Sequence, residues 1–271
     1  LCTWMPNMVL NQLRKEEEAG CYLLTNLSKD IKRNKSGEIV EWNSQSNKKL
    51  NLVANQPSKK MIQLPDEQGY ALDFHHSRYR AKDIIFMGIP GHGYLCTTFR
   101  TQSVNEQTLI TNYNTDNPTY PFNEISVSST DIQIRGAKYD KSVYLPIQHN
   151  CREWTTLFIE WITTSSKING SYIINNDITS SGTFAFDTFW VCTNVIHVGG
   201  RADNTQSLSG QISAIEIYHS PEFNHIKEIP QGLRNLVIKN QMIESDEVEH
   251  LAKKEENIKI ITNNINQSKS C

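Results

Sequence analysis

Most of the chain alternates short apolar runs with turn-forming residues. Between Cys21 and about His219 the runs are strand-sized, and Asn, Ser, Gly and Pro separate them, which is typical of an antiparallel β-sandwich. The runs expected to form strands are Tyr70 to Phe74, Ile84 to Met87, Tyr94 to Thr101, Thr108 to Asn112, Asp131 to Arg135, Ser142 to Leu145, Thr155 to Thr163, Ser171 to Ile174, Val195 to Val198 and Gly210 to Tyr218. No helical period lies between them, so a parallel α/β fold is excluded.

The last of these runs carries apolar residues on both of its faces. Ile212 and Ile215 differ by an odd number of positions, so an extended backbone points them in opposite directions. A strand of this kind belongs inside a layered structure. Gly210 at its start allows a neighbouring strand to approach closely, because glycine has no Cβ.

More polar segments flank the strand-rich region. Residues 1–20 are rich in Leu, Arg, Lys and Glu and end at Gly20, which predicts a helical N-terminal extension. Residues 221–271 form a C-terminal extension, in which Ser245 to Lys254 is expected to be helical. The sequence therefore predicts one sandwich of residues 21–220 between two extensions.

Five short landmarks occur in a recognisable order within the sandwich region. They are Phe99-Arg100-Thr101, Glu153-Trp154-Thr155-Thr156-Leu157, Gly170-Ser171-Tyr172-Ile173-Ile174, Ile196-His197-Val198-Gly199-Gly200 and Leu208-Ser209-Gly210-Gln211-Ile212. Their succession resembles the laminin-G-like domain of the concanavalin A-like lectin and glucanase superfamily. The resemblance implies an all-β, two-sheet antiparallel jelly-roll sandwich. Gln211 replaces the family's closing cysteine, and the opening from Cys21 is more similar to pentraxin-type domains.

Charge and hydropathy exclude two kinds of partner. The 271 residues include 27 Lys and Arg and 29 Asp and Glu, for a formal net charge of −2. This balance argues against nucleic acid as a partner held by overall electrostatics. No apolar run approaches the roughly 18 residues of a membrane-spanning helix, so membrane insertion is not expected. A charged ligand must therefore meet a local patch.

Cysteines and glycosylation sequons favour the secretory route. The six cysteines lack the CxxC spacing of zinc and redox sites, which predicts disulfides whose pairing stays open: Cys2, Cys21, Cys96, Cys151, Cys192 and Cys271. Four Asn-x-Ser sequons predict glycosylation: Asn26, Asn34, Asn169 and Asn266. The absence of a leader before Leu1-Cys2 is the expectation for a processed chain. We therefore expect a secreted, extracellular glycoprotein.

Two kinds of binding site are expected. Arg78, Arg80 and Lys82 fall on one side of an extended stretch, where they would meet sulfate or carboxylate groups of a glycan; a merely solvated surface is the alternative. Laminin-G-like domains often bind calcium at the rim of the sandwich. This resemblance implies calcium as a candidate cofactor, held by the oxygen atoms of Asn114, Asp116, Asp203 and Asn204. The same residue types are also ordinary turn formers.

One string suggests catalysis. Residues Glu244 to Glu249 match the Glu-x-Asp-x-x-Glu pattern of laminarinase-like glycoside hydrolases. The string lies after the sandwich and in a segment expected to be helical, where acids favour a solvated helix start. We therefore expect no catalytic residues and no enzymatic activity.

The favoured function is a non-enzymatic adhesion or lectin-like module that binds extracellular glycans or glycoproteins through rim loops. The alternative is a structural subunit of an extracellular matrix or filamentous assembly, which would associate with itself or with other matrix subunits. Cys2 and Cys271 would then tie down the chain ends or link neighbouring subunits. A glycoside hydrolase is the remote alternative.

Overall fold

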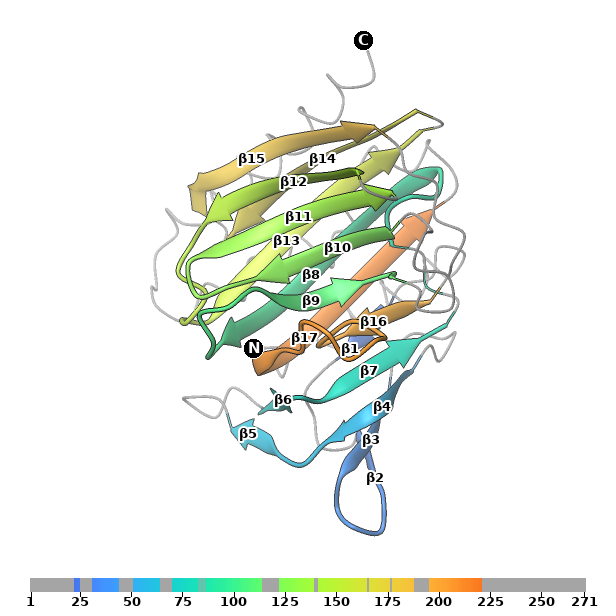
Figure 1. Cartoon of the computed structure of the whole chain (residues 1–271), viewed down its shortest axis with the longest axis vertical. Helices are drawn as coiled ribbons and strands as arrows, with labels where there is room; N and C mark the ends of the chain where they lie inside the picture. The colour runs from blue at the N-terminus through green and yellow to red at the C-terminus, as the bar shows by residue number, and fades with distance from the viewer. Residues whose placement is uncertain are drawn as a thin grey trace, which may run out of the picture.

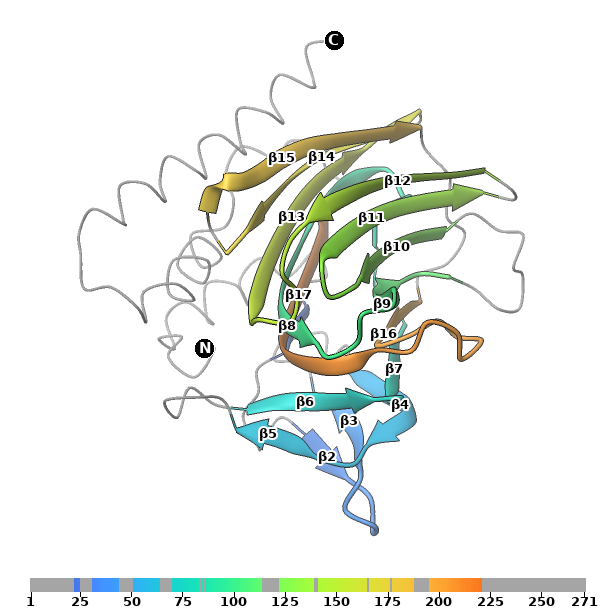
Figure 2. The same cartoon turned by 60° about the vertical axis from the view of Figure 1, so that its left-hand side comes forward.

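The protein folds into two packed antiparallel sheets (Figure 1). The computed structural model describes residues 22–24, 31–43, 51–63, 70–82, 84, 86–113, 122–138, 141–164, 166–175, 177–187 and 195–220. Every regular element in these ranges is a β-strand, and every strand pair is antiparallel. The predicted all-β sandwich is therefore confirmed. Figure 2 shows the two sheets as neighbouring curved layers.

The first sheet has eight strands. In spatial order they are β15 (Asp177–Asp187), β14 (Lys167–Ile174), β13 (Thr155–Thr163), β8 (Gly91–Thr101), β17 (Ser209–Ser220), β6 (Tyr70–His75) and β5 (Met61–Gln63), with β1 (Tyr22–Leu24) pairing β17. Strands β8, β13 and β17 are buried along nearly their whole length, on both faces. This confirms the inference that the closing strand lies inside a layered structure.

The second sheet has nine strands. In spatial order they are β12 (Lys141–Gln148), β11 (Asp131–Lys138), β10 (Phe122–Val127), β9 (Gln107–Thr111), β16 (Ile196–Val198), β7 (Arg78–Ala81), β4 (Leu52–Ser58), β3 (Ile39–Trp42) and β2 (Ile31–Arg33). The chain moves between the sheets after β1, β4, β6, β7, β8, β12, β15 and β16. Strands far apart in the sequence thus become neighbours.

Large side chains fill the space between the sheets. Trp161 is fully buried on the inner face of β13, and the Phe86 ring meets it edge-on with centroids 5.6 Å apart. Trp154 lies just before β13 and is partly exposed, with the Arg100 guanidinium 4.9 Å from its ring. The two tryptophans, seven residues apart, therefore have different environments.

The prediction of a strand from Ile84 to Met87 is wrong. Ile84, Phe86 and Met87 lie outside any strand, although all three are buried. Met87 has a φ of +51°, which no strand residue adopts. These apolar residues belong to a loop whose Phe86 packs against Trp161. A buried loop and a buried strand both require apolar side chains, so the sequence alone does not tell them apart.

Several strands have no clear signal in the sequence. β2, β4 and β15 carry many exposed or half-exposed polar residues, and they lie at or near sheet edges. The helices expected within residues 1–20 and 221–271 lie outside the described residues. Within the described part of the chain, no helix is long and apolar enough to cross a membrane.

Candidate functional site

One row of outward-facing residues crosses the nine-stranded sheet. From β11 to β7 the row consists of Arg135, Glu124, Thr111, His197 and Arg80, each paired with the next across neighbouring strands. The adjacent residues along the strands, such as Ile110 and Val198, belong to the core instead. The row therefore places charged and polar groups from distant parts of the sequence on a single surface.

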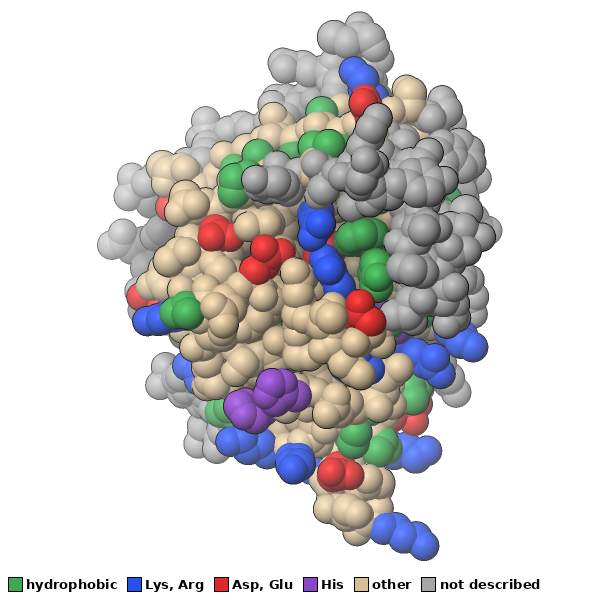
Figure 3. Space-filling model, viewed as in Figure 1, with side chains coloured by type: hydrophobic (Ala, Val, Ile, Leu, Met, Phe, Trp, Pro, Cys, Tyr) green, Lys and Arg blue, Asp and Glu red, His purple; other side chains and the backbone are tan. Residues whose placement is uncertain are grey.

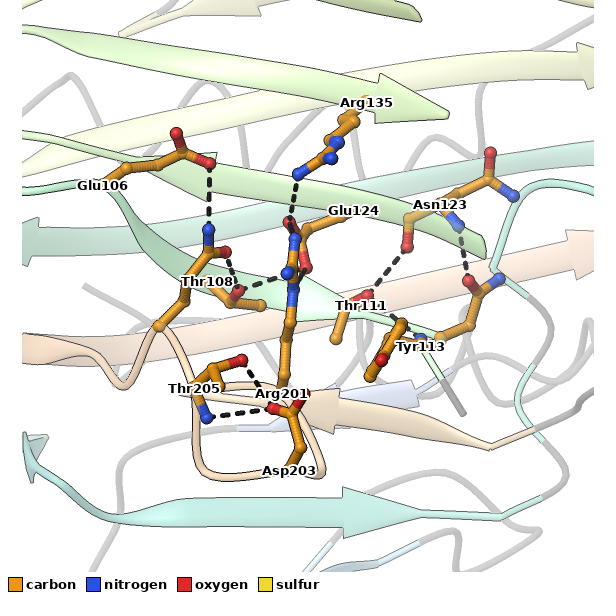
Figure 4. Close-up of polar contacts among 12 residues, drawn as sticks. Glu106, Thr108, Thr111, Tyr113, Asn123, Glu124, Arg135, Arg201, Asp203 and Thr205 are labelled. Atoms are coloured by element: carbon orange, nitrogen blue, oxygen red, sulfur yellow. Dashed lines mark hydrogen bonds and ion pairs between the residues drawn. The ribbon is translucent and has the colours of Figure 1, made fainter. Parts of the chain in front are cut away.

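Arg201 reaches this row from the loop between β16 and β17 (Figure 4). Its Nε and Nη2 atoms donate to Glu124 Oε2 and Oε1 at 2.7 and 2.6 Å. Arg135 Nη1 lies 3.8 Å from Glu124 Oε1, and Thr108 Oγ1 donates to Oε2 at 3.2 Å. Burial lowers the pKa of Arg201, but the hydrogen bonds and charge of Glu124 outweigh it and raise that pKa. The guanidinium is therefore a fixed cation.

Two aromatic rings support the Arg201 guanidinium. Its central carbon lies 5.4 Å from the Tyr113 ring centroid and 5.3 Å from that of Phe122. The two rings meet edge to face at 5.0 Å, and the Arg135 guanidinium lies 5.5 Å from the Phe122 ring. We call Tyr113, Phe122, Glu124, Arg135 and Arg201 the Arg201 platform. Figure 3 shows basic and hydrophobic side chains side by side near the middle of this face.

Parts of the platform remain accessible to solvent. The side chains of Arg135 and Arg201 are 26% and 14% exposed, whereas that of Glu124 is 0% exposed. Tyr113 is partly exposed, and Phe122 is buried beneath the two arginines. The platform thus presents two guanidinium groups and one aromatic ring, while its carboxylate is used internally.

A tight turn brings Arg201 to the platform. Gly199 and Gly200 have φ values of +82° and +149°, as the Gly-Gly pair in the sequence predicts. Further along the loop, Asp203 Oδ1 accepts hydrogen bonds from the Thr205 amide at 3.0 Å and the Thr205 hydroxyl at 2.5 Å. Partial burial raises the pKa of Asp203, but these bonds and the Arg201 charge outweigh it and lower that pKa.

Two of the predicted calcium ligands belong to this turn. Asp203 uses Oδ1 to close the loop, and Asn204 takes a left-handed φ of +66°. Both therefore act as turn formers. Asn114 and Asp116 lie outside the described residues. Among the residues described, no group of three or more His, Cys, Asp or Glu side chains is placed to hold a metal ion, and the calcium site stays a prediction.

The three predicted glycan-binding cations separate in the structure. Arg78 is buried, and its Nη1 donates to the backbone oxygen of Arg201 at 2.5 Å. Burial also lowers its pKa, against a smaller opposing effect of Asp203. Arg80 and Lys82 are exposed. The expectation that all three present their charges together is therefore wrong, because Arg78 is directed against the β16–β17 loop.

His197 occupies the row between Thr111 and Arg80 and was not singled out by the sequence. Burial, followed by the charges of Arg78 and Arg80, lowers its pKa to about 4. His197 is therefore neutral at pH 7. The only sign of His197 in the sequence was its position as a polar residue between the β-branched core residues Ile196 and Val198.

The eight-stranded sheet has its own buried polar residues. On its outer face, His92 Nε2 and Glu160 Oε1 lie 2.6 Å apart, and each side chain is 2% exposed. Glu216 is also 2% exposed, between Cys96 of β8 and the backbone of Leu23 in β1. Burial raises the pKa of Glu216 to about 8. These acids were not predicted, and neither carboxylate is open to solvent. The string from Glu244 to Glu249 lies outside the described residues.

Two of the six cysteines can be placed, and both are buried thiols rather than disulfides. Cys151 lies beside the end of β8, where the amide of Thr101 donates to the Cys151 carbonyl at 2.8 Å. Cys96 lies in the same strand, five residues before Thr101. An extended strand covers about 3.3 Å per residue, which separates the two far beyond disulfide reach. A bond between Cys96 and Cys151 is therefore excluded, and the disulfides predicted with open pairing stay a prediction. Cys2, Cys21, Cys192 and Cys271 lie outside the described residues.

Two of the four sequons can also be placed. Asn34 is exposed in the turn between β2 and β3, and its Oδ1 accepts hydrogen bonds from the amides of Ser36 and Glu38 at 3.0 and 2.9 Å. Asn169 lies in β14, paired with Ile162 on one side and Ala185 on the other. Asn26 and Asn266 lie outside the described residues.

Solved structures share this fold. No protein-family model and no curated protein sequence matches the chain. Domain 4 of an extracellular family 43 arabinanase from Geobacillus stearothermophilus, solved with arabinotriose, has a TM-score of 0.50 and 12% identity, over 75% of this chain and 94% of that one. The binding domain of botulinum neurotoxin DC, solved with rat synaptotagmin II, has a TM-score of 0.53 and 9% identity, over 84% of this chain and 52% of that one.

A third similar structure comes from botulinum neurotoxin type C, whose cell entry depends on two ganglioside molecules. Its TM-score is 0.52 and its identity 10%, over 81% of this chain and 51% of that one. The chain thus spans about half of the toxin chains. At these identities the likeness shows a shared β-sandwich fold, and it does not single out the laminin-G family, which stays a prediction.

Proposed function

We propose that the protein is a secreted, non-enzymatic module that binds a glycan or a glycoprotein, and that the Arg201 platform contacts this ligand. The observation that carries the proposal is the fixed guanidinium of Arg201, held by Glu124 against the rings of Tyr113 and Phe122. The similar structures support the same class, since one was solved with arabinotriose, one with rat synaptotagmin II, and one comes from a toxin whose cell entry depends on two ganglioside molecules.

The chemistry of the platform suits a sugar. Hydroxyl groups need hydrogen-bonding groups in fixed positions, and the apolar faces of sugar rings pack against aromatic side chains. Arg135 and Arg201 supply donors, and Tyr113 supplies a partly exposed ring. Because Glu124 already holds Arg201, little side-chain freedom is lost on binding. A preorganised surface of this kind favours recognition without any chemical step.

The test is a glycan array followed by calorimetry on the full chain. We expect binding to a defined set of glycans, weakened about tenfold or more in Tyr113→Ala and in Arg135→Gln, since Tyr and Arg side chains at the centre of an interface carry much of its binding energy, and tenfold corresponds to about 1.4 kcal/mol. Both variants spare the Arg201–Glu124 pair, so the loop keeps its anchor. Lys167→Gln, which removes an exposed charge from β14 in the other sheet, should bind like the unmodified protein.

Two outcomes would overturn the proposal. One is the absence of binding to every glycan and glycoprotein tested. The other is binding that neither platform variant weakens, which would place the ligand elsewhere on the sandwich.

A further inference from the structure

One end of the sandwich is strongly basic. We define the basic end as residues 31–43, 51–63 and 70–82, which form β2 to β7. These ranges hold eight Lys and Arg residues against three Asp and Glu, whereas the other described residues hold seven against nine. Among the described residues the charge is therefore distributed unevenly. Figure 3 shows Lys and Arg side chains spread over this lower part of the molecule, with few acids among them.

Most of these cations are exposed and lack an acidic partner. Two exposed lysines face carboxylates, at 3.7 Å for Lys32 and Glu41 and at 3.4 Å for Lys60 and Asp73. Five further exposed cations form no ion pair within the described residues: Arg33, Lys35, Lys59, Arg80 and Lys82. Unpaired charges of one sign in one region raise the local potential and attract a ligand of opposite charge.

The unpaired cations come from three separate segments. Arg33 and Lys35 lie on the β2–β3 hairpin, Lys59 lies between β4 and β5, and Arg80 and Lys82 lie in and just after β7. Figure 1 shows these elements grouped at one end of the molecule. Charges spread along an end, rather than gathered around one point, match a chain that carries repeated anionic groups.

We propose that the basic end binds a linear acidic polysaccharide, through the sulfate or carboxylate groups along its length. This surface shares no residue with the Arg201 platform, although Arg80 lies in the same outward-facing row, and Arg78 takes no part because its guanidinium is buried against the β16–β17 loop. A single-stranded nucleic acid carries similar charge, but it also needs aromatic side chains on which its bases stack. Among the described Phe, Trp and Tyr residues of this end only Tyr70 is exposed, while Trp42, Phe74 and Tyr79 are buried. The other exposed rings are the small imidazoles of His75 and His76, which pack against each other, so a sugar chain is the better fit.

The experiment measures binding of the full chain to heparin, which is sulfated, and to hyaluronan, which carries carboxylates only, over a series of salt concentrations. The test variant is Arg80→Gln with Lys82→Gln. The control is Arg152→Gln with Lys167→Gln, an equal charge change at exposed residues away from the basic end. Thermal unfolding establishes that each variant is folded.

We expect heparin to bind with an affinity that falls steeply with salt, because ions are released when cations neutralise a polyanion. The test variant should lower the slope of log affinity against log salt by roughly one for each cation removed, and the control should leave it unchanged. Additional binding to hyaluronan would show that carboxylates suffice, whereas binding to heparin alone would show that sulfate is required. Either result supports the proposal.

Three results would overturn it. The first is no binding to either polysaccharide, and the second is equal weakening by the test and control variants, which would reflect total charge alone. The third is single-stranded DNA binding as tightly as heparin. The test variant should bind the glycan found on the array like the unmodified protein, so failure of the platform proposal and failure of this one are told apart.

Discussion

Arg201 and Glu124 form a two-point ion pair although 77 residues separate them in the sequence. The pair fastens the β16–β17 loop to the middle of β10, with Glu124 fully buried beneath it. The shape of the candidate binding surface therefore depends on a contact between two distant segments. Its strength can be measured apart from ligand binding.

Replacing Arg201 should destabilise the protein. We expect Arg201→Ala to lower the free energy of unfolding by about 3 kcal/mol, because among the described residues the buried Glu124 carboxylate then keeps only the Thr108 hydroxyl and the more distant Arg135. Arg201→Lys should recover only part of this loss, since an ammonium group cannot match both carboxylate oxygens. Urea denaturation provides the measurement, with the exposed Arg152→Ala as control. Equal losses in Arg201→Ala and Arg152→Ala would show that the pair contributes nothing.

Gly210 should tolerate no side chain. A Cβ there would overlap the carbonyl oxygen of Arg100 in the neighbouring strand and lie 2.9 Å from the Cα of Thr101. We expect Gly210→Ala to cost about 3 kcal/mol, because the backbone of β8 must move. Gly37→Ala is the control, since a Cβ there would meet no atom within 4 Å. Its only expected cost is the strain of a side chain at a φ of +82°, which lowers stability by about 1 kcal/mol. Thermal unfolding of the two variants compares them, and a smaller loss at Gly210 would contradict the close approach of β8.

Stability should fall as the solution becomes alkaline. Burial raises the pKa of Glu216 from its ordinary 4.5 to about 8 in the folded protein. The folded state therefore holds a proton that the unfolded state releases, so the stability is complete below pH 4.5 and is lost as the pH rises to about 8. We expect Glu216→Gln to remove this loss and to be more stable than the unmodified protein at pH 9, by on the order of 4 kcal/mol.

A series of melting temperatures between pH 4 and pH 9 provides the measurement for Glu216. At pH 4 the glutamine variant and the unmodified protein should differ little, because the carboxyl is then neutral in both states. If the melting temperatures of the two proteins change in parallel across the whole range, Glu216 does not govern the loss of stability with rising pH.

Glycosylation should distinguish the two sequons that the structure places. Asn34 lies in an exposed turn, the usual setting of an occupied sequon, so we expect a glycan there when the chain is expressed through a secretory pathway. Asn169 lies within β14 between two strands, and we expect it to stay unmodified. Intact mass should fall by one glycan in Asn34→Gln and by no glycan in Asn169→Gln. An Asn34→Gln protein of unchanged glycan mass would contradict this.

The two buried thiols should be unreactive until the protein unfolds. Burial, followed by the nearby charge of Asp131, raises the pKa of Cys151 to about 12, which leaves almost no thiolate to react. We expect Cys96 and Cys151 to resist alkylation in the native protein and to react fully in denaturant without reductant. The other four cysteines should then stay unlabelled if the predicted disulfides form. Six reactive thiols in secreted material would contradict both the disulfides and the extracellular assignment, and rapid native labelling of Cys151 would contradict its burial.

Local patterns in the sequence determine much of the fold. The run from Thr155 to Thr163 is a strand from end to end, because its β-branched and aromatic residues favour a pleated backbone directly. Gly199 and Gly200 mark a sharp turn for a reason equally local, namely their freedom to adopt positive φ. The apolar residues from Ile84 to Met87 show the limit of such signals, since burial alone does not specify a strand.

The tertiary structure alone decides which side chains meet. Arg78, predicted to be an exposed cation, is buried because β7 lies beside β16 and its loop, whereas Arg80 stays exposed two residues later. The platform joins Tyr113 and Arg201 through the order of strands in a sheet, and the same order groups the cations of the basic end. Strand order and register are set by closing long segments of chain over a common core. A local pattern of residues reports backbone preference and burial, but it carries no information about which distant strand becomes a neighbour.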